Sequence, residues 1–451
     1  MKKNIEIRND ALLADISIDK KNYPLIDPIA KIVLERLKES AMHRNTMLCG
    51  PRTLATVLAE CYNQREGILS ARDEELVRAA GNDAYVNITA LKCSAAEAIL
   101  KDLIVAPGGL PFYVEPTPCP ELDDKSERKA LRKTIEQMTQ SGVPEGYDDI
   151  VELARIAKDQ IKDEVLDEAK ERAQRMNDLI RDQCEEGGYR EAIKAFIRDF
   201  VTYPYAVLEG PVYSFKEVDR WEKDKFVTEY EGVYTMRRVS PFDLYWTPDS
   251  TTTQDGTGVT VVERMSVHVL HHLLEHESFI SSQVKKVIDG LSGGKVGTNW
   301  LLQNSEAKSV YGTNLLTKGG TLEVLRHYGV FSGEQLIDAK VRTGRKKDKF
   351  EKGKFYECMV TVVAGVTVQI AVSDRTGQVK RPIHAASYED SGLGIPGKAV
   401  AQQLRDIHRA YLSALRSLMA NANFVSRPIT EIDITKFPED VRKGRNGSRK
   451  E

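Results

Sequence analysis

Four histidines gather in the segment HVLHHLLEHES, at spacings that can bind a metal ion. His272, Glu275 and His276 form the pattern H-x-x-E-H, and His268 lies four residues before His272. On a continuous helix His272 and His276 would share a face and could bind zinc, with Glu275 as a general base. A zinc hydrolase also needs a third ligand, and no strong candidate follows in the sequence. Because two-ligand matches are common by chance, histidines of a core or an interface are the favoured interpretation, and the hydrolase is the alternative.

Three glycines form a second pattern with a possible chemical meaning. Gly392, Gly394 and Gly397 match G-x-G-x-x-G, the fingerprint of dinucleotide-binding folds. That fingerprint needs a parallel βαβ unit and an acidic residue about twenty positions later. Here a helical pattern still continues at that distance, and Pro396 occupies the turn that would approach a pyrophosphate. We therefore interpret the glycines as a sharp turn that leads into a long helix.

The segment 391–428 is the stretch around which the rest of the chain is organised. Pro396 suits the first turn of a helix, and the apolar pattern predicts that this helix continues to about Ala422, roughly 40 Å long. Its apolar residues recur at spacings of three and four, which predicts one buried face. These residues are Val400, Leu404, Ile407, Tyr411, Leu415 and Leu418.

Basic residues follow the opposite face of the same predicted helix. Lys398, Arg405, Arg409 and Arg416 are spaced so that they stack in one narrow stripe. Aligned positive charges repel one another, so water, acidic side chains or phosphate must meet them.

Composition excludes several classes of protein. The 451 residues carry 65 basic and 67 acidic side chains, and a net charge of −2 gives no global bias towards nucleic acid. No apolar run approaches the length of a membrane span, and the first residues lack the apolar core of a signal peptide. The 6 cysteines are scattered without a CxxC pair, which predicts reduced thiols in a protein made in the cytosol.

The first half of the chain is predicted to be mainly helical. Residues 1–23 are polar and predict a loosely held arm, after which helices are expected up to about Tyr62. A strand, a helix and a second strand are expected over 84–115. The charged region 121–186 predicts a solvated helical hairpin, which is broken at Gly142-Val143-Pro144 and ends at Gly187-Gly188.

The second half is predicted to contain most of the strands. Alternating aromatic and β-branched residues predict strands over 205–265 and again over 321–380, where Ala364-Gly365 is the expected hairpin turn. A basic run between two of these strands is either a solvated loop or a contact for phosphate or an acidic partner. Its residues are Arg342, Arg345, Lys346, Lys347 and Lys349. The segment 426–451 is assigned as a basic C-terminal tail, and its last residues, 441–451, are predicted to be disordered.

Three stretches of the sequence resemble the portal proteins of tailed bacteriophages. They are EEGGYREAIKAFIRDFVTYPYAVLEGP, RVSPFDLYWTPDS, and the run from RPIHAASYEDSGLGIPG to SRP. The last is similar to the family signature "G-x-G-x-P, then D-x-x-R-A-x-x-x-L-x-x-x-N" before its second stem helix. With the order of elements between them, the resemblance covers roughly residues 80–430.

This resemblance implies an α+β portal-like subunit with a helical and β wing, two long stem helices and a small clip that contains strands. By this mapping the wing is 24–265, the first stem helix and its connector are 266–320, the clip is 321–380, and the second stem helix is 381–425. Family members usually continue into a tunnel loop and a helical crown. This chain stops about 25 residues after the second stem helix, so a crown is not expected.

The resemblance also implies a structural role without catalysis, cofactor or metal. Family portals form closed rings of about twelve copies through which double-stranded DNA passes without sequence specificity. Their partners are the terminase packaging motor, head-completion and tail adaptor proteins, and the major capsid and scaffolding proteins, with no membrane. They occupy the capsid vertex of the virion after assembly in the host cytoplasm.

In such a ring the basic stripe lies at a subunit interface or faces the channel. Acidic residues of a neighbouring subunit are the favoured counter-charges, because a channel that bound phosphates would grip the DNA that must slide through it.

Overall fold

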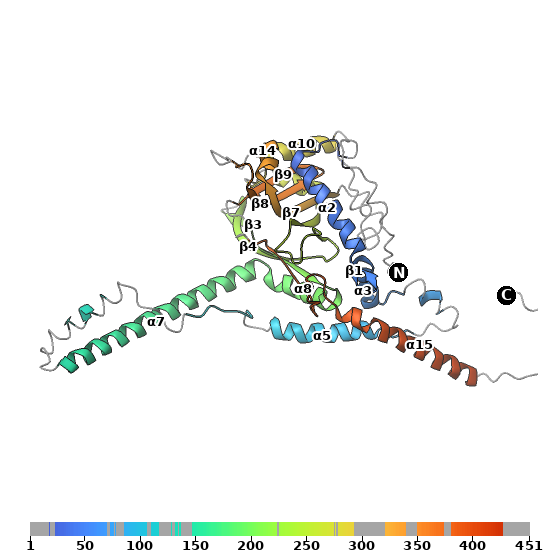
Figure 1. The fold of residues 1–451 in the computed structure, drawn as a ribbon, viewed down its shortest axis with the longest axis horizontal. Coiled ribbons are helices and arrows are strands. Elements are labelled where there is room, and N and C mark those ends of the chain that lie inside the picture. The colour runs from blue at the N-terminus through green and yellow to red at the C-terminus, as the bar shows by residue number, and fades with distance from the viewer. Residues whose placement is uncertain are drawn as a thin grey trace, which may run out of the picture.

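The computed structural model describes residues 23–69, 85–105, 110–116, 147–222, 225–274, 278–292, 321–339, 350–373 and 380–426, with a few isolated positions outside these ranges. Antiparallel sheets and short helices form a body, from which two long helices project in different directions (Figure 1). The predicted α+β class is confirmed.

The chain enters the body through α2 (Pro28–Thr46), the short strands β1 (Leu48–Cys49) and β2 (Arg52–Thr53), and α3 (Leu54–Glu66). Asp27 caps α2, because its carboxylate accepts a hydrogen bond from the backbone N–H of Ala30 at 2.8 Å. The prediction of a loose arm up to residue 23 is wrong at its end. Tyr23 is only 3% exposed because it packs in the core beneath α2.

The next described elements are three helices. They are α5 (Ile88–Ile104), α7 (Tyr147–Glu186) and α8 (Tyr189–Thr202). The strands expected on either side of α5 are absent from residues 85–87 and 110–116, which pair with no other strand, so this prediction is wrong there. The predicted helix before Gly187-Gly188 is confirmed as a single helix of 40 residues, and the break at 142–144 lies outside the described residues.

A long hairpin forms the smaller of the two main sheets. It consists of β3 (Ala206–Glu222) and β4 (Lys225–Val239), and β10 (Ile383–Ala386) joins its edge in the antiparallel order β10-β3-β4. The predicted strands in this region are therefore confirmed. Since β10 lies directly before the long C-terminal helix in sequence, this pairing anchors the start of that helix to the body.

The larger sheet has the antiparallel order β5-β6-β7-β8-β9. Its strands are Leu244–Trp246, Gly258–Ser266, Thr321–Ser332, Phe355–Val363 and Val366–Val372. The turn between the last two strands is the predicted one, with Ala364 and Gly365 both at positive φ, 51° and 80°. The boundaries predicted at 265 and 320, however, do not separate independent units. β6 pairs with β7 along the whole length of β6, so the expected wing and clip share one sheet.

Both faces of this larger sheet are covered. On one face α2 packs against Leu325, Phe331 and Val360. On the other face α9 (Val267–His272) and α10 (Ser281–Ser292) cover Val324 and neighbouring residues, and α14 (Gly333–Asp338) closes the α2 side.

The long helix expected within 266–320 is not continuous in the described part. Between α9 and α10 the chain turns, and the backbone N–H of Ile280 donates a hydrogen bond to the carbonyl of Val368 at 2.8 Å. This turn lets Leu270 of α9 and Val284 and Val287 of α10 pack together on the sheet. Residues 293–320 lie outside the described ranges. Among the described helices, none is long and apolar enough to cross a bilayer.

A buried ion network joins the two main sheets. Glu209 of β3 is 1% exposed and accepts hydrogen bonds from Arg326 at 2.7 Å and from the Tyr328 hydroxyl at 2.9 Å. Arg237 of β4 also binds Glu209, and both arginines contact Glu263 of β6. Burial alone would raise the pKa of the Glu209 carboxyl, but Arg326 and Arg237 outweigh it and hold that pKa below its ordinary value.

Candidate functional site: the C-terminal helix and the pocket beneath it

The glycine turn is held by backbone contacts with the body. Gly394 has a φ of 93°, and the next residue, Ile395, donates its N–H to the carbonyl of Thr251 at 2.9 Å. Gly397 donates to the carbonyl of Pro204 at 3.2 Å and to the Ser387 hydroxyl at 3.1 Å. Because the turn approaches the protein backbone of the body, these contacts give the glycines a structural role. This agrees with the interpretation of the glycines as a sharp turn that leads into a long helix.

Gly394→Ala should lower the free energy of unfolding by about 3 kcal/mol. An added Cβ would overlap the Thr251 carbonyl and would also sit in the left-handed region of backbone conformation. Gly392→Ala is the matched control. It has a similar φ of 72° with nothing within 4 Å of the added atom, so a loss of about 1 kcal/mol is expected. Chemical denaturation of both variants measures the difference, and equal losses would contradict a close approach at Gly394.

The helix α15 (Val400–Ser426) begins four residues later than predicted. Pro396 is not in its first turn, because Lys398 forms an antiparallel β-bridge with Glu389 before the helix starts. The Lys398 amine also binds the Glu389 carboxylate at 2.9 Å. Lys398 is therefore neutralised within the chain and does not lie on the helix.

The prediction that the apolar face of α15 is buried holds only in part, because Val400, Leu404 and Leu415 are half-buried while the other apolar residues of that face are exposed. The buried residues are Ala401, His408, Leu412 and Arg416, which lie on the side of the expected basic stripe. On the expected apolar face Ile407 and Leu418 are 63% and 67% exposed. The helix is thus rotated so that part of its basic side faces the body while apolar side chains face outward.

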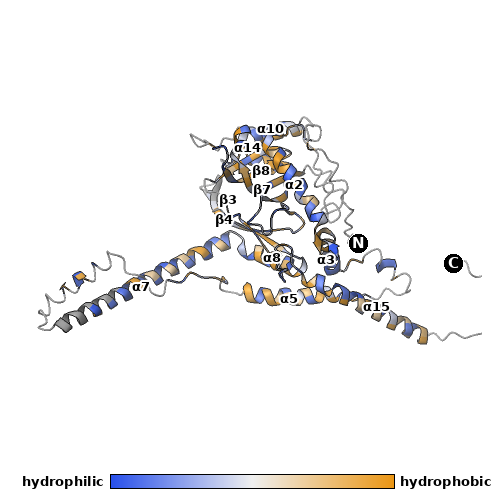
Figure 2. Cartoon of the chain, viewed as in Figure 1, coloured by the Kyte–Doolittle hydropathy of each residue, from blue (hydrophilic) through white to orange (hydrophobic). Residues whose placement is uncertain are grey.

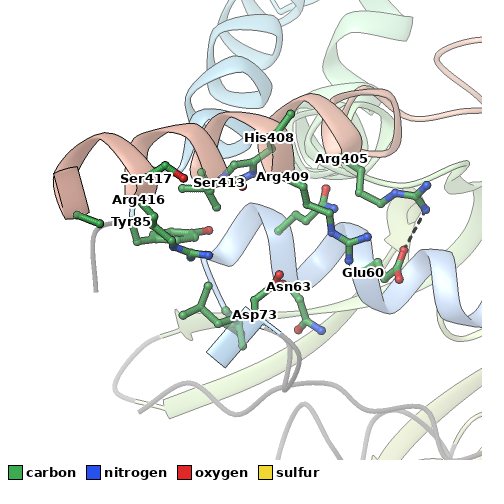
Figure 3. Close-up of a pocket in the computed structure, with 16 residues that line it drawn as sticks. Glu60, Asn63, Asp73, Tyr85, Arg405, His408, Arg409, Ser413, Arg416 and Ser417 are labelled. Atoms are coloured by element: carbon green, nitrogen blue, oxygen red, sulfur yellow. Dashed lines mark hydrogen bonds and ion pairs between the residues drawn. The ribbon is translucent and has the colours of Figure 1, made fainter. Parts of the chain in front are cut away.

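Each arginine of the expected stripe has a different environment. Arg405 is half-buried and contacts Glu60 of α3 at 3.5 Å (Figure 3), so its counter-charge comes from its own chain. Arg409 is exposed, and no hydrogen bond or ion pair joins it to the described residues. Arg416 is 7% exposed, and its Nε and Nη2 atoms have no hydrogen-bond partner among the described residues.

A pocket of about 600 Å³ lies between α15 and α3. Arg409 and Arg416 extend from α15 towards it, Tyr85 lies beside Arg416, and Asp73 borders the pocket on the side away from α15 (Figure 3). Its size falls in the range of small-molecule sites, roughly 300–1,000 Å³. Sequence reasoning found the arginines but missed the pocket, because its other walls come from segments more than 300 residues earlier in the chain.

His408 lines this pocket, but both of its ring nitrogens are hydrogen-bonded within the chain, so neither is available to act on a ligand. Its Nε2 donates to the carbonyl of Val86 at 3.1 Å, and its Nδ1 accepts from the Thr89 hydroxyl at 2.8 Å. Burial lowers the pKa of His408, so the ring stays neutral at pH 7. The Tyr85 ring lies against it, with centroids 5.8 Å apart.

The other predicted sites are not assembled in the described part of the chain. The helix α9 ends at His272, so His276 does not continue its face and instead lies against Phe279. Glu275 and the basic run Arg342–Lys349 lie outside the described residues. Among residues the structure describes, no three His, Cys, Asp or Glu side chains cluster in a way that could hold a metal ion.

Comparison with models of known protein families and with curated protein sequences found no match for this chain.

Proposed function

We propose that this chain is a portal-like subunit that assembles into a closed ring at a phage capsid vertex. The observation that carries the proposal is the outward apolar face of α15. Its exposed large side chains include Ile407, Leu418 and Val425, and Val425 is 79% exposed. An apolar surface of this kind on a monomer marks a site of association.

The shape of the subunit supports association with copies of itself. The end of α15 projects from the body. The helix α5, which packs against the first part of α15 and is rich in hydrophobic residues (Figure 2), carries exposed leucines as well, such as Leu91 and Leu103 at 68% and 75%. A head-to-tail ring would cover this surface on every copy, since each heterologous interface is repeated until the ring closes. The resemblance of the glycine turn and α15 to portal stem sequences also supports association into a ring.

In this proposal the ring has about twelve copies and conducts double-stranded DNA. The packaging terminase, the head-completion and tail adaptors, and the capsid and scaffolding proteins would bind it in turn. No catalytic role, cofactor or metal is assigned. Arg409 is the stripe residue that remains available for a neighbouring subunit or for DNA, because Lys398 and Arg405 are paired within the chain.

Negative-stain electron microscopy of the purified full-length chain tests the proposal directly. We expect rings with a central hole, and light scattering should give a mass near twelve times that of one chain. Particles that remain monomeric over a wide range of salt and protein concentration would exclude a ring as the functional form.

A further inference from the structure

The side chain of Arg416 is unusual because it is buried and lacks a hydrogen-bond partner. It is 7% exposed, and neither Nε nor Nη2 is hydrogen-bonded within the described part of the chain. Buried polar groups are nearly always paired, and a guanidinium is among the most costly groups to leave unpaired. A charged arginine in this state is therefore prepared for a group that the described part of the chain does not supply.

The two unpaired atoms identify the chemistry of that group. Nε and Nη2 carry N–H groups on the same edge of the guanidinium, and this pair donates two parallel hydrogen bonds to two oxygens of a carboxylate or phosphate. In Figure 3 Arg416 extends from α15 into the pocket beside Tyr85. The free edge of the arginine therefore belongs to the wall of a cavity large enough for a ligand.

The charges around the pocket leave a positive excess. Glu60 already neutralises Arg405, and it also pairs with Arg52. Asp73 is the other acidic residue of the lining, set against Arg409 and Arg416. The hydroxyls of Ser413 and Ser417, on the same helix as both arginines, add hydrogen-bond donors beside them.

We propose that this pocket binds an oxyanion, the phosphate or carboxylate group of a small ligand, with Arg416 donating two hydrogen bonds and Arg409 attracting the ligand at the rim. The site goes beyond the proposed ring function and does not depend on it. The remaining lining is largely formed by α3 and α15, so a bound ligand would tie the projecting helix more firmly to the body.

Thermal unfolding and calorimetric titration of the full-length chain test this site. Inorganic phosphate and acetate are titrated separately, against sodium chloride of equal ionic strength. We expect one of the two anions to raise the melting temperature by about 2 °C at concentrations well above its dissociation constant and to release or absorb heat with a single-site isotherm. The effect should disappear in Arg416→Met and persist in Arg175→Met, which removes an exposed arginine from α7. No response to either anion, or the same response in both variants, would overturn the proposal.

Two further measurements keep the test decisive. If Arg416→Met fails to fold, Ser413→Trp places a large ring over the pocket from an exposed position and should abolish the anion response in a folded protein. Light scattering is recorded during the titration. A particle mass that falls as phosphate is added would show that a carboxylate of a second copy normally fills the pocket, which would contradict a small-ligand site.

Discussion

Glu209→Gln should lower the free energy of unfolding by about 3 kcal/mol. Glu209 is the buried carboxylate at which both main sheets meet, and glutamine would leave Arg326 and Arg237 without its negative charge. Removing one partner of a buried ion pair typically costs about 3–5 kcal/mol. The lower end is expected because the Arg237 side chain is 41% exposed and water can partly solvate its charge.

The pH dependence of this difference gives a second measurement. Because the two arginines hold the pKa of Glu209 below its ordinary value of 4.5, the folded chain binds fewer protons at this position than the unfolded chain. Its contribution to stability is therefore present above that pH and is lost as the pH falls through the folded pKa. The wild type and Glu209→Gln should become more alike in stability as the pH falls below 4.5 and then through the folded pKa.

Urea denaturation at pH 7 and at low pH measures both effects. Glu351→Gln is the control, since the Glu351 side chain forms an exposed ion pair with Lys354 at 2.8 Å and its loss should change stability by less than about 0.5 kcal/mol. A loss at Glu209 no larger than the control loss would show that the network does not hold the sheets together.

Local patterns in the sequence predicted the elements of the fold better than their arrangement. The alternating residues around Ala364-Gly365 defined a hairpin because both its strands and its turn are adjacent in sequence. The pairing of β6 with β7 could not be predicted in this way. More than 50 residues separate the two strands, and the local sequence of a strand does not indicate which distant strand it pairs with. This non-local pairing merges the expected wing and clip.

The orientation of α15 at the candidate site also could not be predicted from the sequence, but for a different reason. Helical periodicity correctly predicted a long helix with an apolar side and a basic side, but it cannot say which side meets the body. The partners of His408 and Arg405, namely Thr89 and Glu60, lie in α5 and α3, and only the tertiary structure brings them to α15. The rule that apolar faces are buried held only in part, because Ile407 and Leu418 remain available for another molecule.

The double variant Ile407→Lys with Leu418→Lys should prevent assembly while leaving the subunit folded. Both side chains are already exposed in the single chain, so lysine there should change its own stability little. In a ring they would be buried, and each buried aliphatic side chain contributes at least about 1.5 kcal/mol. Losing two of them would weaken each interface by about 3 kcal/mol, which is about a hundredfold in the association constant.

Analytical ultracentrifugation of the double variant measures this loss, and circular dichroism checks that the subunit is folded. Leu48→Lys is a matched control, because Leu48 is 69% exposed and lies on β1 in the body, away from the projecting end of α15. Rings that form normally in the double variant would show that another surface holds the copies together. Failure of the Leu48 variant as well would show that added charge alone prevents assembly. Assembly lost only in the double variant would identify the outward face of α15 as the surface that joins one copy to the next.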